Sequence, residues 1–148
     1  MSDPALLLVG HGSRRPGHAE TIRRIAAGVA ARVGEVPVRS AFLELSEPSV
    51  GDALDSLAAD GARDLVVVPL LLGEAYHSSV DLPRQLRRAL RRHPGVRAHQ
   101  APVLGPHPLL DATAHRRLLE CGVLPAQPAT GVVLAAAGSS DPAAVATV

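Results

Sequence analysis

Three side chains with metal-binding or acid–base chemistry follow successive predicted strands of this chain: His11, Glu44 and His77. Neutral imidazole is a good ligand for iron, cobalt, nickel and zinc, and a carboxylate can complete such a ligand set. The same side chains can accept protons near neutral pH. Their types therefore indicate a divalent-metal site or a site of proton transfer, and their spacing alone does not separate the two.

His11 stands between two glycines, directly after an apolar run that begins at Leu6. The run is apolar on both faces and too short for a helix, so it predicts a buried parallel strand. Open α/β sheets bind ligands at the carboxyl ends of their strands. Because Gly10 and Gly12 carry no side chains, they leave the imidazole unshielded. We therefore expect His11 to face a ligand.

The rest of the chain alternates between strand and helix periodicity. Further strands are predicted at 36–43, 65–72 and 96–103, and helices at 22–33, 48–61, 79–92 and 109–120. This alternation predicts an α/β fold, namely an open, mostly parallel four-stranded sheet with helices on both faces. Pro69 lies inside the third apolar run and predicts a bend or an irregular strand end there.

An internal similarity links the two ends of the chain. Residues 132–142 repeat the pattern of residues 6–16, with Ala137 in the place of His11. Such a repeat predicts a duplicated domain. The expected organisation is a first domain over 1–122, a linker over 123–130, and the first strand of a degenerate, truncated second repeat over 131–148.

The composition narrows the possible partners. The 148 residues are 47% hydrophobic and 20% charged, which is ordinary for one globular domain. A net charge of +1 and an aromatic content of 1% argue against a nucleic-acid partner. Asp3 and Pro4 precede a short apolar run without a basic segment, and no run has the length of a membrane span. We expect a cytoplasmic protein with no membrane partner.

Four motifs follow one another along residues 6–110. They are VGHGSR at 9–14, FLEL at 42–45 with Pro48, VPLLL at 68–72 with His77, Asp81 and Pro83, and LGPHP at 104–108. In this order they resemble the class II tetrapyrrole chelatases, and above all the sirohydrochlorin chelatase branch. The resemblance implies a lyase that inserts Fe²⁺ or Co²⁺ into sirohydrochlorin, for siroheme or cobalamin. The metal is then a substrate, and no permanently bound cofactor is expected.

The resemblance also implies roles for the three side chains. His11 and His77 correspond to the two active-site histidines of the family, and Glu44 corresponds to its active-site acid. We expect the histidines to present the metal and to accept ring protons. Glu44 is expected to orient one of them or to assist in binding.

Sirohydrochlorin carries several carboxylates, so its site needs positive groups and backbone donors. Gly12, Ser13, Arg14 and Arg15 are the candidate substrate-binding residues, because guanidinium pairs well with carboxylate. Two solvated arginines near a helix start are an equal alternative. Long members of the family are tandem duplications with one site between the halves, and a short form is a homodimer. The resemblance therefore implies that a second repeat or a second copy completes the cleft.

Several interpretations stay open. Asp81 either hydrogen-bonds to a histidine or, with Ser79, starts the next helix, and the helix start is favoured. Glu74 is equally ambiguous, whereas for His107 a turn and helix start is favoured over a metal role. A non-catalytic metal- or tetrapyrrole-binding protein could use the same residues. A histidine phosphatase is disfavoured, because Gly10 stands where its phosphate-binding arginine would precede the histidine.

Overall fold

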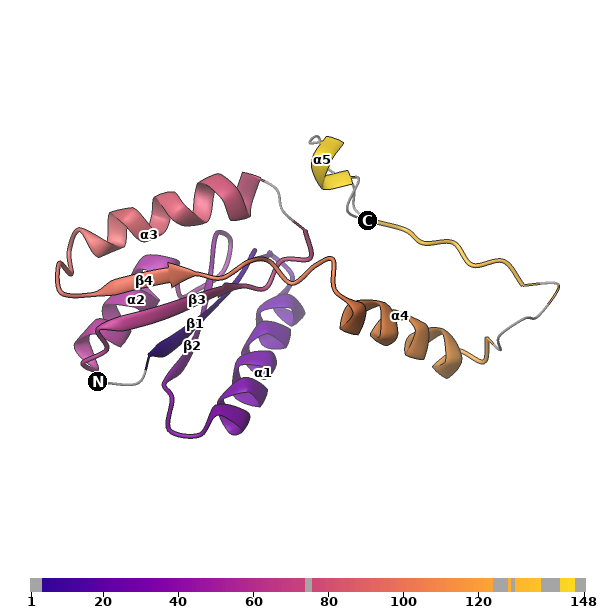
Figure 1. Ribbon diagram of the computed structural model, residues 1–148, viewed down its shortest axis with the longest axis horizontal. Helices are drawn as coiled ribbons and strands as arrows, with labels where there is room; N and C mark the ends of the chain where they lie inside the picture. Colours follow the sequence, from indigo (N-terminus) through magenta and orange to yellow (C-terminus); the bar gives the residue numbers. More distant parts are fainter. Residues whose placement is uncertain (1–3, 74–75, 124–127, 129, 137–141, 146–148) are drawn as a thin grey trace.

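Four parallel strands form one open sheet in the computed structural model, which describes residues 4–73, 76–123, 128, 130–136 and 142–145 (Figure 1). The strand order is β2-β1-β3-β4. The strands are β1 (Ala5–Gly10), β2 (Val38–Phe42), β3 (Asp64–Pro69) and β4 (Arg97–Gln100). The predicted α/β class, with an open parallel four-stranded sheet, is confirmed.

The central strand is β1, which explains its apolar sequence. It pairs in parallel with β2 along one edge and β3 along the other, and nearly all of its residues are buried, so both of its faces lie inside the protein. Gly10 is in register with Phe42, and Val9 is in register with Pro69. The three strands therefore end at nearly the same level, and the segments that follow them meet at one edge of the sheet.

Helices cover both faces, as the sequence predicts. Helix α1 (Pro16–Val33) packs on one face, where Ala19 and Ile22 contact Phe42. Helices α2 (Val50–Ala59) and α3 (Leu82–Leu90) cover the other face and enclose the larger core. Burial of these apolar faces is the main source of stability for such a fold.

Several element boundaries differ from the sequence prediction, and two of them bear on the site. The third strand ends at Pro69, three residues earlier than predicted, because proline cannot donate to the strand ladder. The third helix starts earlier, with a single π-helical turn, η1 (His77–Asp81), that leads directly into α3. His77 therefore lies on the first turn of a helical segment.

The C-terminal part packs little against the sheet. Helix α4 (Pro108–Glu120) has no buried residue and lies beside the sheet in Figure 1, and α5 (Pro142–Val145) is a single turn. Residues 130–136 form no strand, and a strand needs a hydrogen-bonded neighbour. Ala137 and the GSSD segment that follows it, residues 138–141, lie outside the described residues. The duplication and its boundaries at 122 and 130 stay predictions.

Among the helices that the structure describes, none combines the length and apolar character required to cross a membrane.

Candidate active site

The turn after β1 and the turn after β2 are joined at the carboxyl edge of the sheet. The Leu43 amide donates to the Gly10 carbonyl at 3.0 Å, and the Glu44 amide donates to the His11 carbonyl at 3.0 Å. Gly12 has a φ of +99°, and a Cβ there would overlap the carbonyl oxygen of Glu44. The close approach of the two turns therefore requires glycine at position 12.

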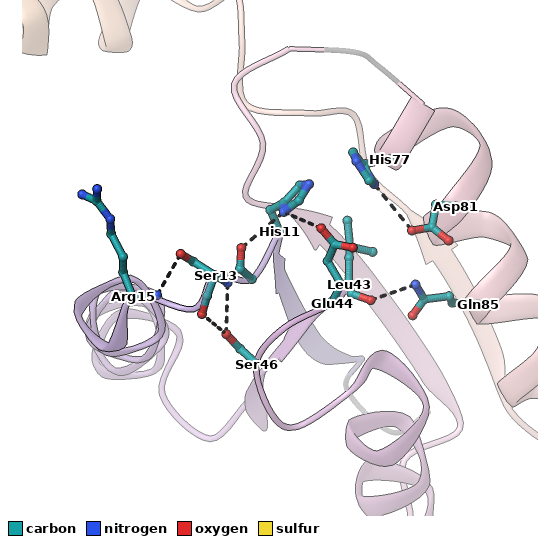
Figure 2. A network of polar contacts seen from close by, with 10 residues as sticks. His11, Ser13, Arg15, Leu43, Glu44, Ser46, His77, Asp81 and Gln85 are labelled. Atoms are coloured by element: carbon teal, nitrogen blue, oxygen red, sulfur yellow. Dashed lines mark hydrogen bonds and ion pairs between the residues drawn. The ribbon is translucent and has the colours of Figure 1, made fainter. Parts of the chain in front are cut away.

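This approach places the Glu44 carboxylate beside the His11 imidazole. The Nδ1 atom of His11 lies 3.6 Å from Oε1 of Glu44 and 3.3 Å from the Gly12 carbonyl oxygen. The other ring nitrogen, Nε2, points away from both groups (Figure 2). The His11 side chain is 37% exposed and the Glu44 side chain 48% exposed, so solvent and ligands reach both.

The second histidine reaches the same place from η1. The ring centroids of His11 and His77 are 4.3 Å apart, and their planes meet at 77°. Nδ1 of His77 lies 3.6 Å from Oδ2 of Asp81, and its Nε2 again points away from the carboxylate (Figure 2). The ring of Tyr76 packs edge-on against that of His77, with the two ring centroids 5.8 Å apart.

The structure thus brings together all three residues that the sequence singled out. Each imidazole turns Nδ1 toward a carboxylate, which leaves Nε2 for a ligand. Two such nitrogens can bind a transition metal or take up protons. Within the described part of the chain, no group of three His, Cys, Asp or Glu side chains is arranged around a common metal position.

The remaining candidate residues build the turn or lie at its outside. The Ser13 amide donates to the Ser46 hydroxyl, and that hydroxyl donates to the Ser13 carbonyl, both at 3.1 Å. The Ser13 hydroxyl accepts from the Arg15 amide. Arg14 and Arg15 are exposed, and the Arg15 guanidinium points away from the two histidines (Figure 2).

Asp81 stands at the start of α3, as the favoured interpretation has it, but it does not cap that helix. Its backbone is already helical, because η1 runs into α3, and its side chain makes no capping hydrogen bond. The carboxylate faces His77 and Arg84 instead. The i, i+4 spacing between His77 and Asp81 is the sequence signal that favours the alternative interpretation, in which Asp81 pairs with a histidine.

The interpretation of His107 as a helix start is confirmed. His107 is the N-cap of α4, and its Nδ1 accepts a hydrogen bond from the Leu109 amide at 3.1 Å. Glu74 lies outside the described residues.

Five exposed apolar side chains, called the apolar rim below, lie in the segments that follow the carboxyl ends of three strands, and the sequence alone does not reveal them as a group. The members of the rim follow β2, β3 or β4, and each is exposed by between 37% and 71%. They are Leu45, Leu72, Tyr76, Val80 and Leu104. Clustered exposed apolar side chains commonly mark a ligand or partner site. A single apolar residue beyond a strand carries no such signal in the sequence.

The chain is similar in sequence to known sirohydrochlorin chelatases. The sirohydrochlorin ferrochelatase of Bacillus subtilis (strain 168) is 36% identical over 139 residues, which cover 93% of this chain and 52% of that protein. The sirohydrochlorin cobaltochelatase of Methanococcoides burtonii is 30% identical over 123 residues, which cover 78% of this chain and 94% of that protein. The chain therefore spans about half the length of the first relative.

A solved structure shows the same fold. The sirohydrochlorin chelatase SirB from Bacillus subtilis subspecies spizizenii, in complex with cobalt, aligns with a TM-score of 0.75 and 31% sequence identity. The alignment covers 80% of this chain and 51% of SirB. Residues 5–121, which include His11, Glu44 and His77, match the family described as CbiX. The chain belongs to the CbiX family.

Proposed function

We propose that this protein is a sirohydrochlorin chelatase, a lyase that inserts Fe²⁺ or Co²⁺ into sirohydrochlorin. The observation that carries the proposal is the contact between the His11 and His77 rings at the carboxyl edge of the sheet, 4.3 Å apart. Relatives named as ferrochelatase and cobaltochelatase support both metals. The metal ion is a substrate, and no permanently bound cofactor is part of the proposal.

Metal insertion has two requirements that the histidine pair can meet. The macrocycle loses two pyrrole protons, and the metal ion loses water ligands as it moves onto the ring nitrogens. A neutral Nε2 can hold the metal or accept a pyrrole proton. In our proposal His11 and His77 share these tasks, and Glu44 keeps His11 oriented through the 3.6 Å contact with Nδ1.

The metal must also leave the protein easily. A closed site with four strong protein ligands holds a metal ion permanently, whereas a site with open positions exchanges its ligands. Two imidazole nitrogens leave most of the coordination sphere to water and to the incoming macrocycle. This ligand set therefore favours transfer of the metal over storage.

The apolar rim supports a large, flat substrate. A tetrapyrrole has an apolar ring face and charged carboxylates around its edge. In our proposal the rim contacts the ring face, while Gly12, Ser13, Arg14 and Arg15 bind carboxylates. Arg14 and Arg15 are exposed, and their long side chains must turn toward the site to do so.

A second half is part of the proposal. A second repeat of a longer chain, or a second copy of this one, would cover the rim and complete the cleft. A cytoplasmic location stays a prediction from the sequence.

The test is an absorbance assay of metal insertion with sirohydrochlorin and either Fe²⁺ or Co²⁺. The wild-type protein is expected to exceed the uncatalysed rate, and His11→Ala and His77→Ala are expected to lose about 100-fold or more of that acceleration. His115→Ala, on the exposed surface of α4, is the matched control and should keep full activity. Circular dichroism checks that all variants fold.

Two outcomes would contradict the proposal. Full activity in His11→Ala or His77→Ala would remove the histidine pair from the reaction. Binding of the metal or of sirohydrochlorin without acceleration of insertion would favour the alternative function, a metal- or tetrapyrrole-binding protein.

A further inference from the structure

Asp81 is a buried carboxylate beside the proposed active site. The residue as a whole is 9% exposed, and it is the one buried charged residue in the part of the chain that the structure describes. Burial of a carboxylate is costly unless both oxygens find partners. Here Oδ1 accepts from the Arg84 guanidinium at 3.3 Å, and Oδ2 faces Nδ1 of His77 at 3.6 Å.

The His77 nitrogen that faces this carboxylate also requires a hydrogen-bond partner. This Nδ1 atom is buried and has no hydrogen-bond partner at normal distance among the described residues. Oδ2 of Asp81 is a few tenths of an ångström beyond hydrogen-bond range. A small rotation of either side chain closes this gap, so that Nδ1–H donates a hydrogen bond to the carboxylate.

The backbone around this pair is held in place from two sides. The π-helical turn η1 sets His77 and Asp81 on one face, and its closing bond joins the Leu82 amide to the His77 carbonyl. One turn later, the Gln85 side chain donates to the Leu43 carbonyl at 3.1 Å. That bond ties the start of α3 to the residue before Glu44 (Figure 2). The pair therefore has a fixed position relative to His11.

We infer that Asp81 is the positioning residue for His77. It accepts a hydrogen bond from Nδ1–H, which leaves the lone pair of the neutral ring on Nε2, and it holds Nε2 toward the opening shared with His11. Arg84 keeps the carboxylate in this orientation. The inference rests on the proposed function only for the use of Nε2, because the ring state itself is a property of the metal-free protein.

The two carboxylates of the site then differ in rigidity. The Glu44 side chain is 48% exposed, whereas the Asp81 side chain is 13% exposed and held by an arginine. Solvent competes for the contact of Glu44 with His11 but far less for the contact of Asp81 with His77. His77 is therefore the more firmly oriented histidine.

The first test reads the ring state without any reaction. In ¹⁵N-labelled, metal-free protein at about pH 8, where an ordinary imidazole is neutral, the His77 signals are assigned by comparison with His77→Asn. We expect a protonated Nδ1 and an unprotonated Nε2 in the wild type and in Asp81→Glu. In Asp81→Asn we expect a mixture of both ring tautomers, because the amide can also donate to Nδ1. An unchanged pattern in Asp81→Asn overturns the inference.

The second test uses the metal-insertion assay. Asp81→Asn is expected to lower kcat by about 10–100-fold, with little change in KM for sirohydrochlorin, and Asp81→Glu should recover part of the loss. Asp60→Asn is the matched control, because Asp60 also pairs with an arginine, Arg39, but lies at the end of α2. It should keep the wild-type kcat.

A further variant covers the case in which Asp81→Asn does not fold. Arg84 is 69% exposed, so Arg84→Gln should fold normally while it frees one oxygen of Asp81. We expect a smaller loss of kcat and a partial mixture of tautomers. A wild-type ring state together with a wild-type kcat in Arg84→Gln overturns the role of Arg84. If the wild-type protein does not accelerate insertion, the proposed function fails, and the ring spectra still decide the role of Asp81.

Discussion

At the scale of single residues, the site depends on how closely two turns approach each other. His11 and Glu44 are joined through backbone hydrogen bonds, and Gly12 leaves room for the Glu44 carbonyl. His77 lies against His11 through side chains alone. The geometry of the first pair is therefore set by the backbone, and that of the second by the orientation of a helical turn.

Gly12→Ala is expected to reduce both stability and activity. Its φ of +99° and the overlap of a new Cβ with the Glu44 carbonyl force the two turns apart. Such backbone strain costs about 1–3 kcal/mol in the free energy of unfolding, measured by urea denaturation. Displacement of Glu44 from His11 should also lower the insertion rate.

Gly17→Ala is the matched control for this substitution. Gly17 lies in α1, and nothing lies within 4 Å of a Cβ placed there. Alanine favours a helix over glycine, so this variant should be as stable as the wild type or more stable. A Gly12→Ala protein with wild-type stability and activity would show that the close approach of the turns is unimportant.

At the scale of the elements, an ion-pair cluster joins α2 to the end of α3. Asp55 accepts two hydrogen bonds from Arg92, both at 2.9 Å, and one from Nε2 of His93 at 2.7 Å. Partial burial raises the pKa of the Asp55 carboxyl, but the hydrogen bonds from His93 and Arg92 outweigh this effect. The pKa is therefore lowered from its usual value of 3.8.

This cluster predicts a pH-dependent contribution to stability. Because the carboxyl pKa is lower in the folded than in the unfolded chain, the contribution is complete above about pH 4 and is lost as the pH falls through the folded value. Asp55→Asn should lower the free energy of unfolding at pH 7 by about 0.5–1 kcal/mol, since Asp55 is partly exposed and screened by solvent.

Urea denaturation at several pH values checks this prediction. The difference between wild type and Asp55→Asn should shrink at pH 3 and below. A difference that grows on acidification would have the wrong sign for a lowered pKa and would contradict the role given to Asp55.

At the scale of the whole molecule, the proposed site lies open. The apolar rim is exposed, and the chain spans about half the length of its Bacillus subtilis relative. Exposed apolar area of this kind is normally covered by a ligand or a partner. We predict that a second copy of this chain covers it, so that the insertion rate per molecule rises with protein concentration as dimers form.

Gel filtration or sedimentation across the assay range measures the association. The rate per molecule should follow the dimer fraction, and Leu72→Asp on the rim should weaken both. A strictly monomeric protein with full activity at every concentration would contradict the prediction.

The sequence alone predicted the α/β fold class, which the structure confirms, and singled out the two histidines, which the structure brings into contact. A strand that is buried on both faces must be apolar throughout, so the run before His11 stands out, and the next polar residue falls at the sheet edge. The same reasoning found Glu44 directly after the second strand, whereas His77 comes five residues after the predicted end of the third. These signals are local, because they depend only on the residues of one strand and its end.

Only the tertiary structure decided how these residues meet. The order β2-β1-β3 places the ends of three strands side by side, and neither this order nor its register follows from any one segment. The π-helical turn η1 forms where α3 packs on the sheet. It places His77 against His11 and buries Asp81. The apolar rim likewise exists only when separate turns gather at one edge. Such features depend on contacts between distant segments, which the pattern of a single segment does not record.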